Sequence, residues 1–132
     1  MNRFGALLLD TNALISAAVT PSRFGKRARY LVEKSPRLYY SSISIAELEI
    51  KAVNKKLSNL DEFYEGLTES ALTELPFQAN HALALSRFTQ LVKHDPFDRL
   101  ILSQAAAENI ALITSDRVLL SLGLPWVIDA SE

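Results

Sequence analysis

The chain has 132 residues, of which 48% are hydrophobic and 22% are charged, a balance typical of a soluble globular domain with one compact core. It contains no cysteine, which excludes disulfides, thiolate nucleophiles and cysteine-based zinc sites. The longest apolar run near the amino end covers residues 6–9, far fewer than the roughly 18 residues of a membrane span, and it ends in Asp10 rather than at a cleavage-like site. We therefore expect neither a membrane span nor a signal peptide.

The net charge of −1 argues against tight binding of nucleic acid through bulk charge. The basic residues are nevertheless unevenly distributed. Residues 21–60 contain nine Lys or Arg and three Glu, so this segment carries +6 and the remainder of the chain −7. A basic sector of this kind can guide a polyanion, and solvated helix faces produce the same pattern.

Strand-like and helix-like stretches alternate along the first half of the chain. Residues 4–9 are predicted to form a short buried strand, residues 12–18 and 24–34 two helices, and residues 37–41 a second strand. A helix is predicted to begin at Ser44, because the apolar residues that follow have the spacing of one helical face. These residues are Ala46, Ile50, Val53 and Leu57.

The second half of the chain continues the alternation. Helices are predicted over 60–68 and 80–91, with a weak strand over 71–75 between them. Asp95 supplies a capping side chain and Pro96 a proline at the first helical position, which predicts a helix from Pro96 to about Glu108 that Asn109 can end. Strands are expected over 110–113 and 126–128, so the whole pattern predicts an α/β domain with a mostly parallel sheet.

Four acidic residues occupy equivalent places in this layout. Asp10 and Asp116 follow predicted strands, whereas Glu47 and Asp98 lie in the first turns of predicted helices. Because strand carboxyl ends and the amino ends of the following helices share one edge of a parallel sheet, we expect the four carboxylates to converge there. Their mutual repulsion must then be relieved by protons or by a cation.

Each acid also has a structural explanation when it is considered alone. Ser44 and Glu47 fit a capping box, and Glu47 is correctly spaced for an ion pair with Lys51. The three aspartates suit helix amino ends. The convergence of all four favours a site instead, because independent caps need not face a single cleft.

Hard oxygen ligands without His or Cys indicate Mg²⁺, or Mn²⁺, rather than zinc or copper. A divalent ion held by carboxylates can orient water and neutralise charge on a phosphate oxygen during in-line displacement. Phosphodiester hydrolysis that leaves a 5′-phosphate and a 3′-hydroxyl is therefore the expected reaction.

Several polar neighbours complete the candidate site. Four of them lie beside the acids and have two possible roles: they can orient ligands or water, or they can serve as turn and cap residues. They are Thr11, Asn12, Thr114 and Ser115. Arg99 follows Asp98 and suits either a phosphate contact or a helix-surface ion pair. His81 and His94 lack metal-ligand spacing and are interpreted as surface or capping residues, although Asp95 places His94 near the site.

Four segments together carry a resemblance to a known family, and they span nearly the whole chain. They are Asp10-Thr11-Asn12, Ser44-Ile45-Ala46-Glu47-Leu48, His94-Asp95-Pro96-Phe97-Asp98-Arg99-Leu100-Ile101 and Thr114-Ser115-Asp116. In these segments the chain resembles the PIN-domain family and, more narrowly, VapC-type toxins of bacterial type II toxin-antitoxin systems.

The resemblance implies one PIN-like three-layer domain over residues 1–132, with a central sheet flanked by helices. It implies a cytoplasmic Mg²⁺- or Mn²⁺-dependent endoribonuclease in which Asp10 and Asp98 are the principal metal ligands. Glu47 and Asp116 would bind metal directly or through water, with Thr114 and Asn12 in support. It also implies a homodimer neutralised by a cognate antitoxin, which would bind helices within residues 12–57.

Two other readings of the acids remain open at this point. Haloacid-type phosphatases and receiver domains also place acids at strand ends, but the former need an Asp at position 12 and the latter paired acids and a lysine after the last strand, where this chain has Ile128-Asp129-Ala130. The other alternative is a non-catalytic binding module whose acids hold a structural ion.

Overall fold

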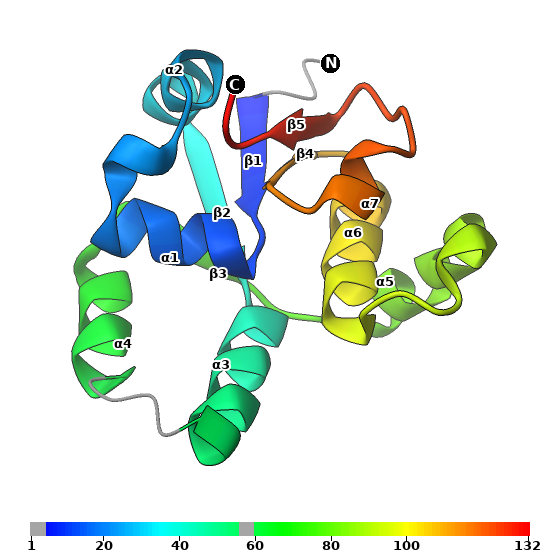
Figure 1. Cartoon of the computed structure of the whole chain (residues 1–132), viewed down its shortest axis with the longest axis horizontal. Coiled ribbons are helices and arrows are strands. Elements are labelled where there is room, and N and C mark those ends of the chain that lie inside the picture. Colours follow the sequence, from blue (N-terminus) through cyan, green and yellow to red (C-terminus); the bar gives the residue numbers. More distant parts are fainter. Residues whose placement is uncertain (1–4, 56–59) are drawn as a thin grey trace.

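The structure is a computed structural model that describes residues 5–55 and 60–132. Within these residues, five strands form one parallel sheet in the order β3-β2-β1-β4-β5 (Figure 1). The strands are β1 (Ala6–Leu9), β2 (Arg37–Ser41), β3 (Leu72–Leu75), β4 (Ala111–Thr114) and β5 (Val127–Asp129). The predicted parallel sheet is therefore confirmed, and all of its pairings are parallel.

The strand order reverses direction between β1 and β4. From β1 the chain proceeds outward through β2 to β3, and it then returns to β4 on the other side of β1. In a parallel sheet this reversal leaves a crevice at the carboxyl ends of the two central strands, where such folds bind ligands. Leu9 of β1 is paired with Ile113 of β4, so Asp10 and Thr114 lie next to each other at this crevice.

Helices cover both faces of the sheet and its carboxyl edge, which gives the three predicted layers (Figure 1). The helices are α1 (Thr11–Val19), α2 (Lys26–Lys34), α3 (Ser42–Lys55), α4 (Leu60–Glu69), α5 (Ala79–Leu83), α6 (Pro96–Glu108) and α7 (Arg117–Leu120). Two short 3₁₀ helices, η2 (Pro21–Arg23) and η3 (Ala84–Leu91), connect them.

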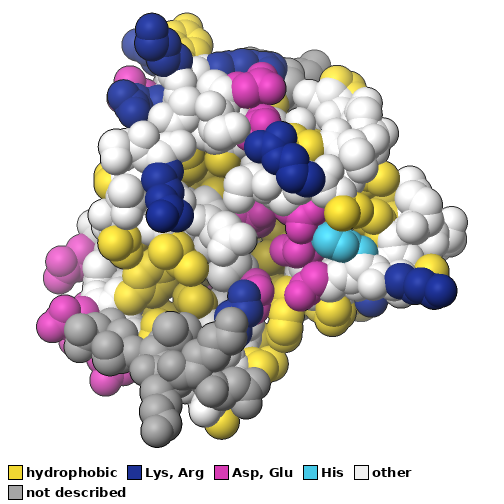
Figure 2. Space-filling model, in the orientation of Figure 1, with side chains coloured by type: hydrophobic (Ala, Val, Ile, Leu, Met, Phe, Trp, Pro, Cys, Tyr) yellow, Lys and Arg dark blue, Asp and Glu magenta, His cyan; other side chains and the backbone are white. Residues whose placement is uncertain are grey.

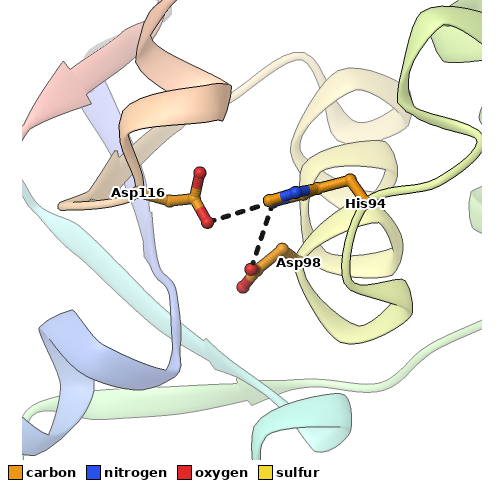
Figure 3. A group of neighbouring side chains, drawn as sticks. All are labelled: His94, Asp98 and Asp116. Atoms are coloured by element: carbon orange, nitrogen blue, oxygen red, sulfur yellow. Dashed lines mark hydrogen bonds and ion pairs between the residues drawn. The ribbon is translucent and has the colours of Figure 1, made fainter.

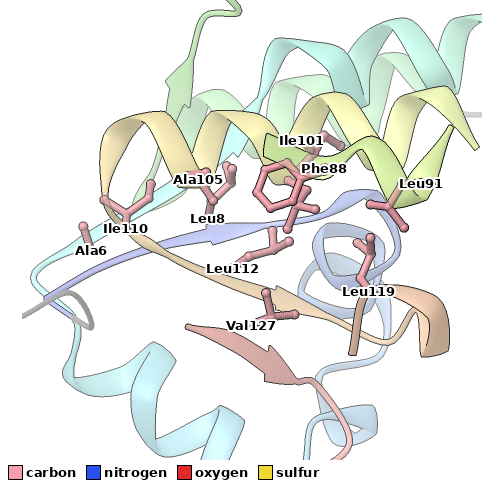
Figure 4. Close-up of a cluster of buried hydrophobic side chains, with 12 residues drawn as sticks. Ala6, Leu8, Phe88, Leu91, Ile101, Ala105, Ile110, Leu112, Leu119 and Val127 are labelled. Carbon is pink, nitrogen blue, oxygen red and sulfur yellow. The ribbon is translucent and has the colours of Figure 1, made fainter. Parts of the chain in front are cut away.

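Alternating side chains of the central strands build two separate cores. Leu8 and Leu112 point to the face covered by α6, η3 and α7, where they meet Ile101 and Phe88 (Figure 4). Leu7, Leu9 and Ile113 point to the opposite face, covered by α1, α2 and α4. Because β1 and β4 are buried on both sides, their sequences are continuous apolar runs rather than alternating ones.

The helix that was predicted from Pro96 to Glu108 has these bounds in the structure. Asp95 caps its amino end, and Asn109 ends it in the left-handed conformation with φ 56°. Other predictions needed correction. The helix predicted over 80–91 is α5 followed by η3, and within η3 the backbone leaves helical geometry at Phe88. The short helix α7 was not predicted.

The start of α3 also differs from the prediction. The helix begins at Ser42, because the Ser41 hydroxyl accepts a hydrogen bond from the backbone N–H of Ile43 at 2.9 Å. The apolar positions Ala46, Ile50 and Val53 are exposed, and Val53 is 83% exposed. The predicted positions Phe4 and Leu57 lie outside the described residues.

Among the described residues, no helix combines the length and the apolar character that crossing a membrane requires.

Candidate metal centre

The candidate site begins at Asp10, the first residue after β1. Its backbone N–H donates to the Ile113 carbonyl of β4 at 3.1 Å, which fixes it at the crevice. One carboxylate oxygen accepts from the Ala13 N–H at 2.9 Å and caps α1, and the other accepts from the Thr114 hydroxyl. Burial raises the pKa of Asp10 to about 6, with smaller contributions from the charges of Asp116 and Glu47.

Asp116 occupies the equivalent place after β4. Its Oδ1 accepts from the Leu119 N–H at 3.0 Å and caps α7, while its own N–H donates to the Thr114 hydroxyl oxygen at 3.0 Å. Thr114 therefore connects Asp10 and Asp116 and is a positioning residue for both. Burial acts to raise the pKa of Asp116, but hydrogen bonds from Leu119 and Asp98, together with His94, outweigh it, and this pKa lies below its ordinary value.

Asp98 comes from the first turn of α6, where the N-cap Asp95 fixes the backbone. Asp95 Oδ1 accepts from the N–H groups of Phe97 at 2.8 Å and Asp98 at 3.3 Å. Burial raises the pKa of Asp98 to about 8, and a hydrogen bond and charge repulsion from Asp116 add to the effect. The two neighbouring carboxyl groups are therefore shifted in opposite directions, with the pKa of Asp98 above and that of Asp116 below the ordinary value.

Glu47 completes the group from α3. Its carboxylate is buried, and Oε2 forms an ion pair with Lys51 Nζ at 2.7 Å, which confirms the predicted pair four residues apart. Its other oxygen, Oε1, is buried without a hydrogen-bond partner among the described residues. The charges of Glu47 and Asp116 act on Asp10, and those of Asp10 and Asp116 act on Asp98. The four acids therefore form one electrostatic group.

One face of the molecule carries a gathering of acidic side chains. Acidic side chains gather around a hollow in the middle of one face, and a histidine lies beside them (Figure 2). The predicted convergence of four carboxylates at one edge of the sheet is what the structure contains, and the predicted helix caps at Asp10, Asp95 and Asp116 are present as well. An aspartate of this group can therefore cap a helix and belong to the candidate site at the same time.

His94 takes part in the site more closely than the sequence indicated. Its Nε2 lies 3.0 Å from Asp116 Oδ2 and 3.4 Å from Asp98 Oδ2, between the two carboxylates (Figure 3). A histidine nitrogen therefore lies beside the carboxylate oxygens that were expected from the sequence. A signal was present in the sequence, since His94 lies four residues before Asp98, but its partner Asp116 is distant along the chain.

The remaining predicted residues have varied positions. Thr11 is buried and its hydroxyl shares a hydrogen bond of 2.9 Å with the Ser44 hydroxyl, which ties α1 to α3. The predicted capping box of Ser44 and Glu47 is wrong, because Ser44 lies inside α3 and bonds across to Thr11. Asn12 is exposed, and Arg99 is half-buried, with an Nε that has no hydrogen-bond partner among the described residues.

His81 lies away from this group and has the capping role that was expected of it. The Gln78 N–H donates to its Nδ1 at 2.9 Å, and its Nε2 lies 2.7 Å from Glu108 Oε2. It is fully buried rather than on the surface.

Comparison with known proteins identifies the family. The chain belongs to the PIN domain family, whose sequence profile matches residues 7–123. A search of curated protein sequences found no match. The membership sets aside the phosphatase and receiver readings of the acid cluster.

Solved structures with the same fold include toxin-antitoxin complexes. A chain of VapBC2 from Rickettsia felis, bound to a DNA fragment from its promoter, is similar over 93% of this chain and 96% of its own, with a TM-score of 0.66 and 24% identity. A toxin-antitoxin complex from Klebsiella pneumoniae covers 96% of this chain and 98% of its own, with a TM-score of 0.64 and 24% identity. A chain of DNA-bound VapBC from Salmonella typhimurium is similar over 93% of this chain and 95% of its own, with a TM-score of 0.65 and 23% identity.

Proposed function

We propose that this protein is a Mg²⁺- or Mn²⁺-dependent endoribonuclease and the VapC-type toxin of a type II toxin-antitoxin pair. The observation that carries the proposal is the convergence of Asp10, Glu47, Asp98 and Asp116 at the crevice between β1 and β4. Membership of the PIN domain family and the likeness to VapBC complexes support it. A cytoplasmic homodimer is part of the same proposal.

The residues present fit a divalent cation. Glu47 Oε1 is a buried anionic oxygen without a partner among the described residues, and such an atom is costly unless something positive approaches it. Burial also raises the pKa values of Asp10 and Asp98, and the charges of neighbouring carboxylates add to this effect. A cation held by these acids relieves both costs at once.

When bound, the cation would orient water and neutralise charge that develops on the scissile phosphate. The chain's own residues hold the acids in place for this. Thr114 fixes Asp10 and Asp116 relative to each other, and Lys51 fixes one oxygen of Glu47 and leaves the other available. The N-caps of α1 and α7 hold the two aspartates against helix amino ends, which restricts their rotation.

Cleavage of a structured RNA pool tests the proposal. Purified wild-type protein and Asp98→Asn would be assayed with Mg²⁺, Mn²⁺ or chelator, and the product ends mapped. We expect metal-dependent cutting by wild type that leaves 5′-phosphate ends, and a loss of about 100-fold or more in Asp98→Asn, because the side chain keeps its shape but loses its charge. Equal cutting by both proteins, or 2′,3′-cyclic phosphate ends formed in chelator, would contradict the proposal.

An apolar groove supports the antitoxin part of the proposal. It has a volume of about 600 Å³ and lies between α1, α3 and α4, partly within the predicted range 12–57. Its lining includes Ile15, Val19, Leu48, Phe63 and Leu67. An apolar groove between helices suits an amphipathic helix of a partner chain, and we propose that the cognate antitoxin places one there.

A matched pair of exposed valines tests this groove. Val19 lies in the groove and is 69% exposed, whereas Val92 lies elsewhere and is 70% exposed. Binding to the product of the adjacent antitoxin reading frame is expected to weaken at least tenfold in Val19→Glu and to stay unchanged in Val92→Glu. Equal binding by the two variants would remove the groove from the antitoxin interface.

A further inference from the structure

One nitrogen and two carboxylate oxygens converge in the group of His94, Asp98 and Asp116. Their ligand atoms all lie within 4.8 Å of one another, and each side chain is about one-fifth exposed. They come from three separate elements: the turn after η3, the first turn of α6 and the N-cap of α7 (Figure 3). The ligand atoms therefore face a common space that is open to solvent.

The backbone of His94 is held by local hydrogen bonds. The His94 N–H donates to the Leu91 carbonyl at 2.9 Å, and the chain then enters α6 through the Asp95 cap. Nε2 is directed at the two carboxylates. A ligand held this way needs little reorganisation to bind a cation.

The protein's other histidine provides a contrast. Both ring nitrogens of His81 are used by the fold, since Nδ1 accepts from the Gln78 N–H and Nε2 is paired with Glu108. The Nε2 contacts of His94 go instead to two acids of the candidate site. With its proton on Nδ1, the same Nε2 offers a lone pair in the direction of those acids.

We propose that His94 Nε2 is a direct ligand of the catalytic cation, together with Asp98 and Asp116, which makes this a mixed nitrogen and oxygen site. The inference rests on the proposed metal-dependent function and refines it. Its consequence is selectivity. Mg²⁺ prefers oxygen ligands, whereas imidazole suits transition metals, so the site favours Mn²⁺ over Mg²⁺. The acid group also contains the unpartnered, buried Glu47 Oε1, which independently indicates a cation.

Pulsed electron paramagnetic resonance of the Mn²⁺-loaded protein tests ligation without reference to activity. We expect nitrogen modulation in the wild type, a change to the ¹⁵N pattern after labelling with ¹⁵N-histidine, and loss of this signal in His94→Gln. Because the chain has only two histidines, the assignment is unambiguous. Mn²⁺ binding without histidine modulation in the wild type would overturn the inference and leave the proposed function intact.

Metal affinities provide the second readout. We expect the ratio of Mn²⁺ to Mg²⁺ affinity to fall about tenfold in His94→Gln and in His94→Glu, with the exposed neighbour Lys93→Ala as the matched control. Circular dichroism would verify folding of each variant. An equal loss for both metals would mean that His94 only orients the carboxylates by hydrogen bonds, which contradicts ligation. A wild type that binds neither metal would contradict the metal-dependent function and this inference together.

Discussion

Two groups of buried polar side chains lie at opposite ends of α6, and they differ in how fully the protein satisfies them. At the carboxyl end, both ring nitrogens of His81 have partners, one of which is Glu108. At the amino end, four acids crowd together, and Glu47 Oε1 lacks a partner among the described residues. Each group brings a histidine to a carboxylate, so the residue types alone do not distinguish them.

The difference shows which polar groups stabilise the fold and which are held at a cost. A satisfied buried network rigidifies its surroundings, whereas clustered charges destabilise the folded state unless a ligand compensates them. Gln104, in the middle of α6, belongs to the satisfied kind, because Ser41 donates to it and it donates to the Leu75 carbonyl. We therefore expect substitutions at the two ends of α6 to change stability in opposite directions.

The largest expected effect is at the satisfied end. His81→Ala removes a fully buried ring, leaves the Gln78 N–H without its acceptor, and is expected to lower the free energy of unfolding by about 3 kcal/mol. Urea denaturation of the two proteins measures the difference. Glu108→Gln keeps a hydrogen-bond acceptor for the ring and is the milder control. An unchanged free energy of unfolding in His81→Ala would show that the His81 group does not stabilise the fold.

The next largest expected effect is the pH dependence of stability, which arises from the acids at the amino end of α6. The folded state raises the pKa of Asp10 from 3.8 to about 6 and that of Asp98 to about 8, so it binds these protons more tightly than the unfolded chain does. This stabilisation is present in full below pH 3.8 and is lost as the pH rises through 6 and then 8. In chelator, the free energy of unfolding is therefore expected to fall as the pH rises from 4.5 to 8.

Urea titrations at a series of pH values test this loss, and saturating Mn²⁺ is expected to abolish it because the cation binds the deprotonated acids. Asp10→Asn should reduce the slope near pH 6. A stability that increases with pH over this range in chelator would show that the acids are not crowded as described.

The smallest of the three effects has the opposite sign to that of His81→Ala. In the folded state Asp98 must either take up a proton or keep a charge that burial and Asp116 disfavour, and Asn avoids both costs. Asp98→Asn is therefore expected to raise the free energy of unfolding in chelator by about 1 kcal/mol, while cleavage is lost. Thermal or urea unfolding of wild type and variant under identical conditions provides the number. Destabilisation by Asp98→Asn would place this residue with the structural group instead.

Much of the fold followed from local signals and one rule of topology. Asp95, Pro96 and Asn109 mark both ends of α6, and capping depends on residues only a few positions apart. The convergence of Asp10 and Asp116 followed from the parallel sheet alone, because any sheet of this kind brings strand carboxyl ends together.

What the sequence did not reveal depends on contacts between distant segments. Ser44 has the local pattern of an N-cap, but its hydroxyl bonds Thr11 from another helix. The contact between His94 and Asp116 could be predicted only if the position of α7 were known, because Asp116 is the N-cap of that helix. Helix α7 has only four residues, which is too few for a helical period of apolar residues to appear in the sequence.

Crystallography of Mn²⁺-soaked protein, with data collected at the manganese absorption edge, tests the central claim most directly. We expect an anomalous peak at the crevice between β1 and β4, beside Asp10 and bound by Asp98, Asp116 and His94 Nε2. A well-ordered crystal at saturating Mn²⁺ that has no peak among these carboxylates would contradict it.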